Sequence, residues 1–394
     1  MIYTMFMDKM APGILRLSVM DNDLDLFEGQ YPVPQGVSYN TYLIEDDQLC
    51  LLDTVDARKQ EEWLAGLDEV LAGRKLDYLV ISHMEPDHAG SIAALCARQP
   101  QLKLVANART FAILDQFSGD DPLTQERITV ADGGALALGS HTLHFVLAPM
   151  VHWPEVMAVY EDSQKVLFSA DGFGNFGSLT DTDAWADEAR RYYGNIVGKY
   201  GVQVQNLFKK IAGLDIQMLC PLHGFVWRRD LGYILEKYNL WSTYTPEDKG
   251  VMIAYASIYG NTENAAEILA SKLRERGVRT AMYDVSVTPA SDIIAECFRW
   301  SHLVFASTTY NGGIFVTMDE LLRDIAAHNL QKRTVAFMEN GTWAPVSARQ
   351  MAAILAPLKN MTVLEQSVAI RSSLTEGQLA EIEALADVIA EGIR

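Results

Sequence analysis

The sequence has few cysteines and no cysteine pair of the kind that binds metals or exchanges electrons. Only four occur in 394 residues, and they stand far apart, at Cys50, Cys96, Cys220 and Cys297. Without a CxxC pair, a zinc knuckle, a rubredoxin-like iron site and a thioredoxin motif are excluded. We expect reduced thiols, most of them buried.

Long hydrophobic runs and basic charge are also scarce. No apolar stretch approaches the ~18 residues that a membrane helix needs, and the N-terminus lacks the basic start and apolar core of a signal peptide. We therefore expect a cytoplasmic protein. With 32 basic against 51 acidic residues the net charge is −19, so nucleic acid and anionic membranes are unfavourable partners.

The length and one polar stretch predict the domain organisation. A chain of 394 residues should form two or three domains, at about 100 to 200 residues each. Residues 241–250 (WSTYTPEDKG) combine polar side chains with Pro246 and Gly250 and precede an apolar strand, as a linker does. We place the domains at residues 1–248 and 249–394.

The second domain alternates strand-like runs with helical patterns. Five such β-then-α units predict a parallel sheet covered on both faces, which is a doubly wound, flavodoxin-like α/β architecture. The strands are expected at 251–256, 278–285, 302–307, 333–338 and 361–369, and the helices are expected to begin near residues 262, 290, 316, 345 and 375.

The first domain is richer in short strands. A β-rich half with interspersed helices suits two packed sheets with helices outside, although spacing alone does not fix the topology. The strands are expected at 37–44, 49–55, 76–81, 143–147, 165–169 and 217–220, and the helices at about 57–73, 89–98, 107–116, 184–212 and 229–238.

Four potential metal ligands follow one of these strands within six positions: His83, Glu85, Asp87 and His88. In an extended segment His83 and Glu85 point the same way, because side chains alternate with a period of two, and they can share one metal. A turn follows, so Asp87 and His88 can serve a second metal a few ångströms away, as paired metal sites require.

Three further candidates, His152, Asp171 and His223, lie just beyond other predicted strands. A single histidine is more often structural than a ligand, but seven candidate ligands at strand exits indicate one shared metal site. The remaining histidines, His141, His144, His302 and His328, are assigned to structure or surface.

The pattern HxExDH, followed by a distant histidine, an aspartate and a last histidine, resembles the metallo-β-lactamase superfamily. Zinc hydrolases of that superfamily usually have HxHxDH, whereas Glu85 replaces the second histidine here. The replacement exchanges a borderline nitrogen donor for a hard oxygen, and three carboxylates with four imidazoles suit iron better than an all-nitrogen site would. Ligand type alone does not settle the metal.

In the second domain, the loop after the first strand has the composition of an anion site. Small hydroxyl residues and backbone N–H groups at a helix N-terminus hold phosphate. The loop lacks the lysine of GxxxxGK[ST], which argues against a nucleoside triphosphatase and is compatible with the monophosphate of FMN. For this loop alone an ordinary strand-to-helix turn is the alternative. Its candidate FMN-binding residues are Ser257, Ile258, Tyr259, Gly260, Asn261 and Thr262.

Two further loops at the same predicted sheet edge support a flavin site, because ligands of doubly wound sheets bind at this edge. Tyr310 and Trp343 are expected to flank a flat ring, and glycines let the backbone approach it. These loops contribute the candidates Thr308, Thr309, Tyr310, Asn311, Gly312, Gly313, Asn340, Gly341, Thr342 and Trp343.

A metallo-β-lactamase-like domain with HxExDH joined to a C-terminal flavodoxin domain resembles the flavodiiron proteins, also called A-type flavoproteins, over nearly the whole chain. The resemblance implies an N-terminal αββα sandwich that holds two irons. It also implies the ligand sets: His83, Glu85 and His152 for one iron, Asp87, His88 and His223 for the other, and Asp171 as the bridging carboxylate.

The same resemblance implies an activity: reduction of dioxygen to water or of nitric oxide to nitrous oxide, with electrons passing through FMN. We expect an external donor, a rubredoxin or a reduced deazaflavin, because the sequence shows neither rubredoxin cysteines nor a nicotinamide-binding domain. The family forms head-to-tail homodimers, in some cases dimers of dimers. A zinc-dependent hydrolase with an appended flavodoxin domain, and an electron carrier with a vestigial metal half, are the alternatives.

Three residues are expected to act beside the irons. Tyr192 and Tyr193 resemble a tyrosine of the family near the irons, and one of them is expected to donate a hydrogen bond. Where family members often have Phe-His-Gly, this chain has Phe27-Glu28-Gly29. A carboxylate at Glu28 would change proton delivery and leaves the preferred gas open; a solvated loop residue is the alternative.

Overall fold

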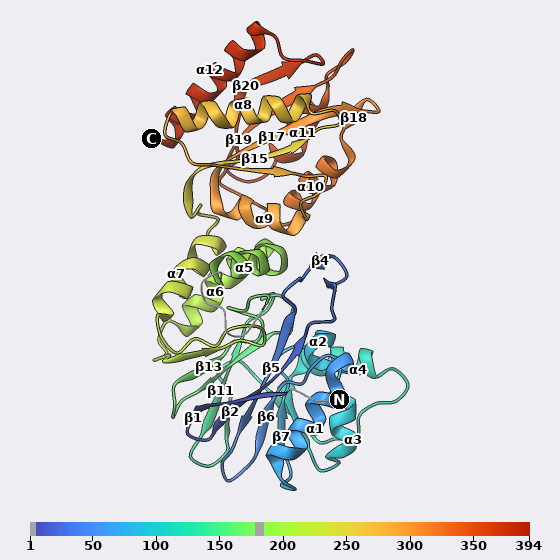
Figure 1. Ribbon diagram of the computed structural model, residues 1–394. Helices are drawn as coiled ribbons and strands as arrows, with labels where there is room; N and C mark the ends of the chain where they lie inside the picture. The colour runs from blue at the N-terminus through green and yellow to red at the C-terminus, as the bar shows by residue number, and fades with distance from the viewer. Residues whose placement is uncertain (1–4, 178–184) are drawn as a thin grey trace. The chain divides into compact units, whose positions relative to one another are not determined.

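The computed structural model describes residues 5–177 and 185–394 and divides by its contacts into two compact units (Figure 1). Unit 1 is Met1–Ala189 with Val202–Tyr238, and unit 2 is Arg190–Gly201 with Asn239–Arg394. The predicted domain boundary after residue 248 stays a prediction, because a division by contacts does not test which stretches fold alone.

Unit 1 contains two β-sheets and a short ribbon. The first sheet runs in the order β1-β2-β5-β6-β7-β8-β9: β1 (Phe6–Ala11), β2 (Ile14–Asp21), β5 (Val37–Ile44), β6 (Cys50–Leu52), β7 (Tyr78–Val80), β8 (Lys103–Asn107) and β9 (Arg127–Val130). The second follows chain order: β10 (Ala135–Ala137), β11 (Thr142–Leu147), β12 (Met157–Glu161), β13 (Val166–Phe168) and β14 (Met218–Cys220). The ribbon pairs β3 (Leu26–Phe27) with β4 (Tyr31–Pro32).

Strand β5 shows how the layers of unit 1 are held together. All eight of its residues are buried, so both of its faces are covered. Because neighbouring side chains point to opposite faces, Thr41 accepts a hydrogen bond from the Trp63 indole (3.0 Å), whereas the Tyr42 ring meets Phe168 of the second sheet at 5.0 Å. Helix, sheet, sheet is therefore the order of layers at this strand.

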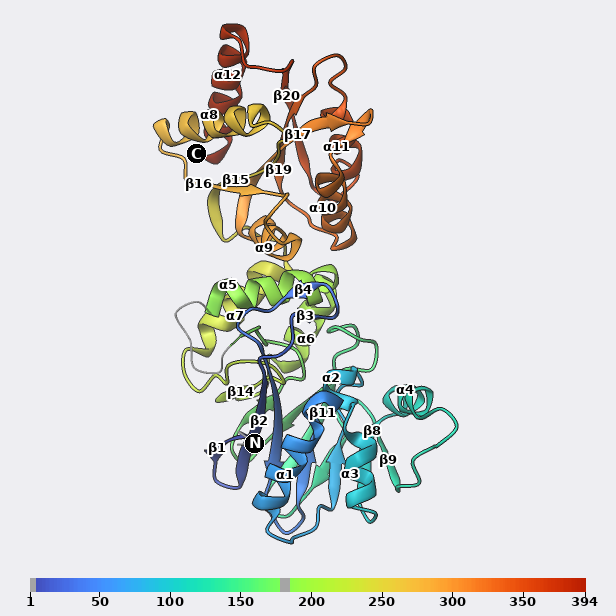
Figure 2. The ribbon, with the colours of Figure 1, turned by 45° about the vertical axis from the view of Figure 1, so that its right-hand side comes forward.

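The helices of this part of the chain lie on the outside of the sheets. Helix α1 packs on β2 and α4 packs on β8, and Figures 1 and 2 show α1, α3 and α4 gathered on the same side of unit 1. The helices are α1 (Gln60–Leu71), α2 (Pro86–Ala89), α3 (Ile92–Arg98), α4 (Ala108–Ser118), α5 (Trp185–Tyr192), α6 (Gly201–Ile211) and α7 (Leu231–Ser242).

The helix predicted over 184–212 is interrupted. Residue 184 lies outside the described residues, and between α5 and α6 the chain forms a π-helical turn at Tyr193–Val197 and a 3-10 turn at Gly198–Tyr200. Within unit 2, a Cβ on Gly194 or Gly198 would lie 3.2 or 2.9 Å from the ring of Phe298. Close contact with this ring therefore requires glycines at positions where a regular helix would favour larger residues.

Unit 2 is built on a parallel sheet in the order β16-β15-β17-β19-β20, with a small hairpin partner, β18. The strands are β15 (Asp248–Ala256), β16 (Thr280–Asp284), β17 (Trp300–Tyr310), β18 (Gly313–Ile314), β19 (Thr334–Asn340) and β20 (Thr362–Ile370). The helices are α8 (Asn261–Glu275), α9 (Ala290–Arg299), α10 (Val316–Ala327), α11 (Ser347–Leu355) and α12 (Glu376–Ile393).

The helices of unit 2 cover both faces of its sheet, as predicted. On one face α8 and α12 pack on each other and on β15 and β20; α9, α10 and α11 lie on the other face (Figure 2). Leu269 and Leu273 of α8 and Leu385 and Ile389 of α12 share one buried cluster with Ile253 of β15. The apolar stripes of α8 and α12 thus face the strands. The loops that follow the carboxyl ends of the strands are not covered by these helices.

The predicted fold classes are confirmed in both units, although β1, β2, β3, β4, β8, β9, β10, β12 and β18 were not among the predicted strands. Strand β2 illustrates the reason, because its polar Arg16 is buried and pairs with Asp8 of β1 at 3.5 Å. A charged residue inside a strand obscures the alternation on which sequence prediction relies. No helix in the described part of the chain is long and apolar enough to cross a membrane.

Candidate metal centre and cofactor cavity

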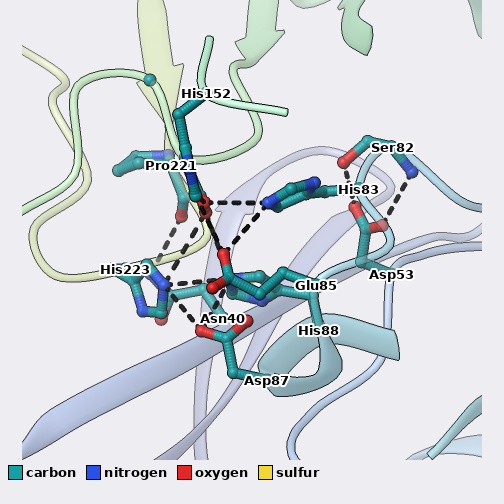
Figure 3. A network of polar contacts seen from close by, with 12 residues as sticks. Asn40, Asp53, Ser82, His83, Glu85, Asp87, His88, His152, Pro221 and His223 are labelled. Carbon is teal, nitrogen blue, oxygen red and sulfur yellow. Dashed lines mark hydrogen bonds and ion pairs between the residues drawn. The ribbon is translucent and has the colours of Figure 1, made fainter. Parts of the chain in front are cut away.

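Seven side chains meet where strands of both unit 1 sheets end (Figure 3). These are His83 and Glu85 after β7, Asp87 and His88 on α2, His152 between β11 and β12, Asp171 after β13, and His223 after β14. All seven are at most 8% exposed. The structure therefore brings together every metal-ligand candidate, from stretches as far apart as residues 83 and 223.

The seven residues form two groups that share Asp171. His83, Glu85, His152 and Asp171 have ligand atoms within 4.8 Å of one another, and so do Asp87, His88 and His223. One oxygen of Asp171, Oδ2, lies 3.2 Å from His83 Nε2 and 3.1 Å from His152 Nε2. The other, Oδ1, lies 3.1 Å from His88 Nε2 and 3.7 Å from His223 Nε2. Asp171 thus directs one oxygen to each group.

Strand β5 fixes the orientation of His223. The Nδ1 of His223 donates to the carbonyl of Ser38 at 2.9 Å, which leaves Nε2 directed at the cluster. Asn40 Nδ2 and the Tyr42 hydroxyl donate to the carbonyl of Pro221, at 3.0 and 2.6 Å, and hold the loop that carries His223. A hydrogen bond at the outer ring nitrogen sets which nitrogen is available to a metal.

The exit of β7 is fixed by a buried carboxylate. Asp53 accepts from the backbone N–H of Ser82 at 2.8 Å and from its hydroxyl at 2.6 Å. Ser82 directly precedes His83, so these two bonds set the position at which the ligand loop leaves the sheet (Figure 3).

Charges within the cluster stabilise one another strongly. Burial disfavours a charged imidazole, but Asp171 and Glu85 outweigh this and raise the pKa of His152 to about 9. Asp87 and Asp171 have the same effect on His223, whose pKa is raised to about 9. Burial also opposes an ionised Asp171, yet His83 and His88 hold its pKa well below its usual range. Buried carboxylates that hold protons on nearby imidazoles are a favourable setting for bound cations.

The donor atoms fit two metal ions. His88 Nε2 and His223 Nε2 lie 2.9 Å apart. Two nitrogens that bind one ion at about 2.1 Å each, at a right angle, would be about 3.0 Å apart. Both oxygens of Asp87 and Oδ1 of Asp171 lack hydrogen-bond partners in the described part of the chain. Hard carboxylate oxygens with imidazoles are a donor set that suits iron.

Unit 2 has a cavity of about 710 Å³ at the carboxyl ends of its strands. The three predicted loops line it, together with Ala344, Val346 and Ser372. Of the sixteen predicted residues, Gly260 and Gly313 are not part of the lining; Gly260 lies between the lining residues Tyr259 and Asn261, and Gly313 directly follows Gly312. The cavity therefore combines the last residues of β17 and β19 with the segments that follow β15, β17, β19 and β20.

The lining fits a phosphorylated aromatic ligand. Ser257–Thr262 leads into the fifteen-residue helix α8, whose N-terminus favours an anion, and Ser257 Oγ accepts from the N–H of Gly260 at 3.1 Å. Trp343 and Tyr259 are 88% and 91% exposed although they line the cavity. The strand order reverses between β15 and β17, which is where doubly wound sheets bind flavin.

Known proteins match both units. Residues 37–224 match the family described as ODP family beta lactamase, and residues 253–363 match the flavodoxin family. A nitric oxide reductase of Moorella thermoacetica is 32% identical over 79% of this chain and 80% of its own. The structure of rubredoxin oxygen:oxidoreductase from Desulfovibrio gigas superposes with a TM-score of 0.92 at 27% identity, over 98% of each chain. The flavodiiron protein of Giardia intestinalis has the same fold, with a TM-score of 0.92 at 24% identity over 99% of this chain and 98% of its own.

The chain belongs to the flavodiiron protein family. The cofactors of a flavodiiron protein are FMN and two irons, and the cavity and the seven-residue cluster are the parts of this chain whose chemistry fits them.

The three residues expected to act beside the irons are placed differently. Glu28 lies on the β3–β4 ribbon loop with a φ of 48°, near enough to Glu85 for their charges to interact. Burial, which disfavours the charged form, and the negative charge of Glu85 together raise the pKa of Glu28 to about 7. Tyr192 and Tyr193 are buried and belong to unit 2, where the ring of Tyr193 meets Trp241 at 5.5 Å. The roles of all three stay predictions.

Sequence reasoning missed the residues that hold the ligands rather than serve as ligands. Glu155, Ser38 and Asp53 contact the cluster or its loops, and Ser372 lines the cavity. A signal was present for Glu155, which follows His152-Trp153-Pro154 and is an acidic residue between two apolar stretches. Its partner is 72 residues away, so the sequence alone does not reveal the pair.

Proposed function

We propose that this flavodiiron protein is an oxidoreductase that reduces dioxygen to water, nitric oxide to nitrous oxide, or both, at a two-iron centre supplied with electrons through FMN. Its relatives include proteins named nitric oxide reductase and rubredoxin-oxygen oxidoreductase, the latter 28% identical over 98% of each chain. Both names describe oxidoreductases that act on a small gas or transfer electrons to one.

The position of Asp171 is the observation that carries the proposal. A single buried carboxylate whose two oxygens face two separate ligand groups supports a pair of adjacent metal ions, and paired ions can bind both atoms of a small substrate. We propose His83, Glu85 and His152 for one iron, Asp87, His88 and His223 for the other, and Asp171 as the bridge.

When bound, FMN would accept an electron pair and pass electrons on singly, and two irons would make them available for reduction of the gas. The chain's own residues orient the ligand side chains and shield them from water. Ser38 and Glu155 fix the rings of His223 and His83, and the buried cluster keeps bulk water from the ligand atoms. We propose that Glu28, near Glu85, exchanges protons with solvent, and that Tyr192 or Tyr193 donates a hydrogen bond at the centre.

The cavity of unit 2 is proposed to hold FMN. The N-terminus of α8 and the hydroxyls of Ser257 and Thr262 suit the phosphate, and Tyr310 and Trp343 are proposed to flank the isoalloxazine ring. Backbone groups of Asn311 and Gly312, both at positive φ, are proposed to face its polar edge.

We propose an external electron donor such as a rubredoxin or a reduced deazaflavin, a head-to-tail homodimer or a dimer of such dimers, and a cytoplasmic location. The location is supported by four cysteines that are all free and buried. Reduction assays with a purified rubredoxin test the electron donor, and analytical ultracentrifugation tests the oligomeric state.

Anaerobic stopped-flow spectroscopy tests the function. Protein assayed for iron and FMN is fully reduced and mixed with dioxygen or nitric oxide while flavin reoxidation is followed. We expect rapid reoxidation by at least one gas, loss of it in His83→Ala, and retention in His144→Ala, whose imidazole is exposed and pairs with Asp162. Equal rates in His83→Ala and the unmodified protein would refute the diiron mechanism.

The alternative of a zinc-dependent hydrolase is not favoured. It would use the metal cluster but leaves the 710 Å³ cavity of unit 2 without a role. Zinc in the purified protein, together with a metal-dependent ester or amide hydrolysis, would reverse this preference.

A further inference from the structure

The side chain of Glu155 is buried against His83, its one ion-pair partner among the described residues. One oxygen, Oε1, lies 2.8 Å from His83 Nδ1 and accepts the backbone N–H of Met84 at 2.9 Å. The other oxygen, Oε2, has no hydrogen-bond partner among the described residues. Glu155 is 1% exposed, and no lysine or arginine in the described part of the chain pairs with it. Its charge is therefore directed at His83.

Neighbouring groups hold this pair in place. Asn107 Nδ2 donates to the backbone carbonyl of Glu155 at 2.7 Å, and Asn107 also caps the N-terminus of α4. The ring of Trp153 meets the ring of His83 edge-on, with centroids 5.3 Å apart. These contacts surround the pair, and Glu155 is buried beside the His83 imidazole.

The two ligand groups differ in this respect. In the second group, Nδ1 of His223 meets a neutral carbonyl, that of Ser38, and Nδ1 of His88 has no hydrogen-bond partner in the described part of the chain. A carboxylate at the outer nitrogen makes an imidazole a stronger donor than a carbonyl does, because it favours positive charge on the ring. The group that contains His83 thus has the more electron-rich imidazole.

We propose that Glu155 is a positioning residue that makes the metal position of His83, Glu85 and His152 the more tightly held and more easily oxidised of the two. The redox part of this inference rests on the proposed function. The affinity part concerns any divalent metal that the cluster binds.

Chelator competition on the full-length protein tests the affinity. Protein loaded anaerobically with Fe²⁺ is titrated with a chelator, and the iron that remains is counted. In Glu155→Gln, which keeps the shape but removes the charge, we expect one of two irons to be held about 10- to 100-fold more weakly and the other to be unchanged.

Glu161→Gln is the matched control. Glu161 is fully buried, and its Oε1 lies 2.9 Å from Nδ1 of His141, outside the metal cluster. The same change of a buried carboxylate to an amide next to a histidine should leave both irons and their potentials unaffected. Equal iron loss in Glu155→Gln and Glu161→Gln would mean that both variants are merely less stable, and it would overturn the proposal.

A redox titration followed by electron paramagnetic resonance measures the reduction potential of the iron pair, which a general loss of protein stability would not change. The potential at which the mixed-valence iron pair appears should become more positive in Glu155→Gln and stay unchanged in Glu161→Gln. An unchanged potential with unchanged affinity, or simultaneous loss of both irons in Glu155→Gln alone, would contradict the proposal.

A second variant covers the case in which Glu155→Gln does not fold. Asn107→Asp keeps the cap of α4, because aspartate is a good N-cap, but it cannot donate to the Glu155 carbonyl. As in Glu155→Gln, we expect one of the two irons to be held more weakly. Retention equal to that of the unmodified protein would count against the proposal. If the unmodified protein reduces neither gas, the function fails, yet the same competition with Zn²⁺ still tests the affinity.

Discussion

The metal cluster and the cofactor cavity are built in opposite ways. The cluster consists of seven side chains, each at most 8% exposed, fixed by hydrogen bonds from strands and buried carboxylates. The cavity is lined by loops, with Trp343 and Tyr259 largely exposed. A site for small ions needs many converging charges, whereas a large flat cofactor needs an open edge and supplies much of its own contact surface. The two sites should therefore respond differently to single substitutions.

The largest effect is expected at the shared carboxylate. Asp171→Asn removes the charge that faces both ligand groups, so we expect loss of both metals and of gas reduction while FMN stays bound. Elemental analysis and the flavin absorbance measure the two cofactors separately. Asp162→Asn, an exposed aspartate paired with His144, is the control and should retain both. If Asp171→Asn kept two metals, the bridging role would be wrong.

A substitution at Ser257 is expected to have the opposite selectivity: FMN binding is weakened and the metals are retained. Ser257→Asp places a negative charge at the proposed phosphate position, which should cost about 1 to 2 kcal/mol and weaken FMN binding by about 10-fold or more. The metal content should not change. Fluorescence titration of the FMN-free protein with FMN measures the affinity, and Ser257→Ala separates the added charge from the lost hydroxyl. Unaltered affinity in Ser257→Asp would place the phosphate elsewhere.

Acid should destabilise unit 2 through the buried His302. Burial lowers the pKa of His302 in unit 2 to about 4, below its ordinary value near 6.5. The unfolded chain therefore binds the proton more readily, and unit 2 loses stability as the pH falls from about 6.5 towards 4.

This loss can be measured at full length. We expect urea unfolding of unit 2, followed by release of FMN fluorescence, to require about 1 to 2 kcal/mol less at pH 5.0 than at pH 7.5. His302→Gln should have a smaller difference between these pH values. The same pH dependence in both proteins would exclude His302 as the cause.

The smallest effect is expected from the exposed ring at the cavity. Trp343→Ala removes one stacking surface, worth about 0.5 to 1.5 kcal/mol, so FMN should bind about 2- to 10-fold more weakly. Val287 is 80% exposed and does not line the cavity, so Val287→Ala is the matched control. A loss of 100-fold or more would make the cavity as dependent on single side chains as the cluster.

Much of the cluster and of the second fold could be predicted because their determinants are local in sequence. His83, Glu85, Asp87 and His88 fall within six positions, and the regular alternation after residue 250 corresponds to α8–α12 and their strands. The chemistry of a ligand is a property of its residue type, so these positions are recognisable without a structure.

The supporting contacts could not be predicted because they join distant positions. Glu155 meets His83 across 72 residues, and Ser38 meets His223 across 185. An acidic residue or a serine has many possible roles, and only the pairing of strands selects one. Likewise, Gly194 and Gly198 interrupt a helical pattern because of Phe298, about 100 residues later.

The division of the chain has a consequence for how such a gene can be recombined. Residues 190–201 belong to unit 2 although unit 1 continues after them, from Val202 to Tyr238. A single crossover near residue 248 would separate these residues from the Phe298 ring to which Gly194 and Gly198 are fitted. Exchange of the two halves between homologous genes therefore keeps this fit only where the incoming half also supplies an aromatic ring at the position of Phe298.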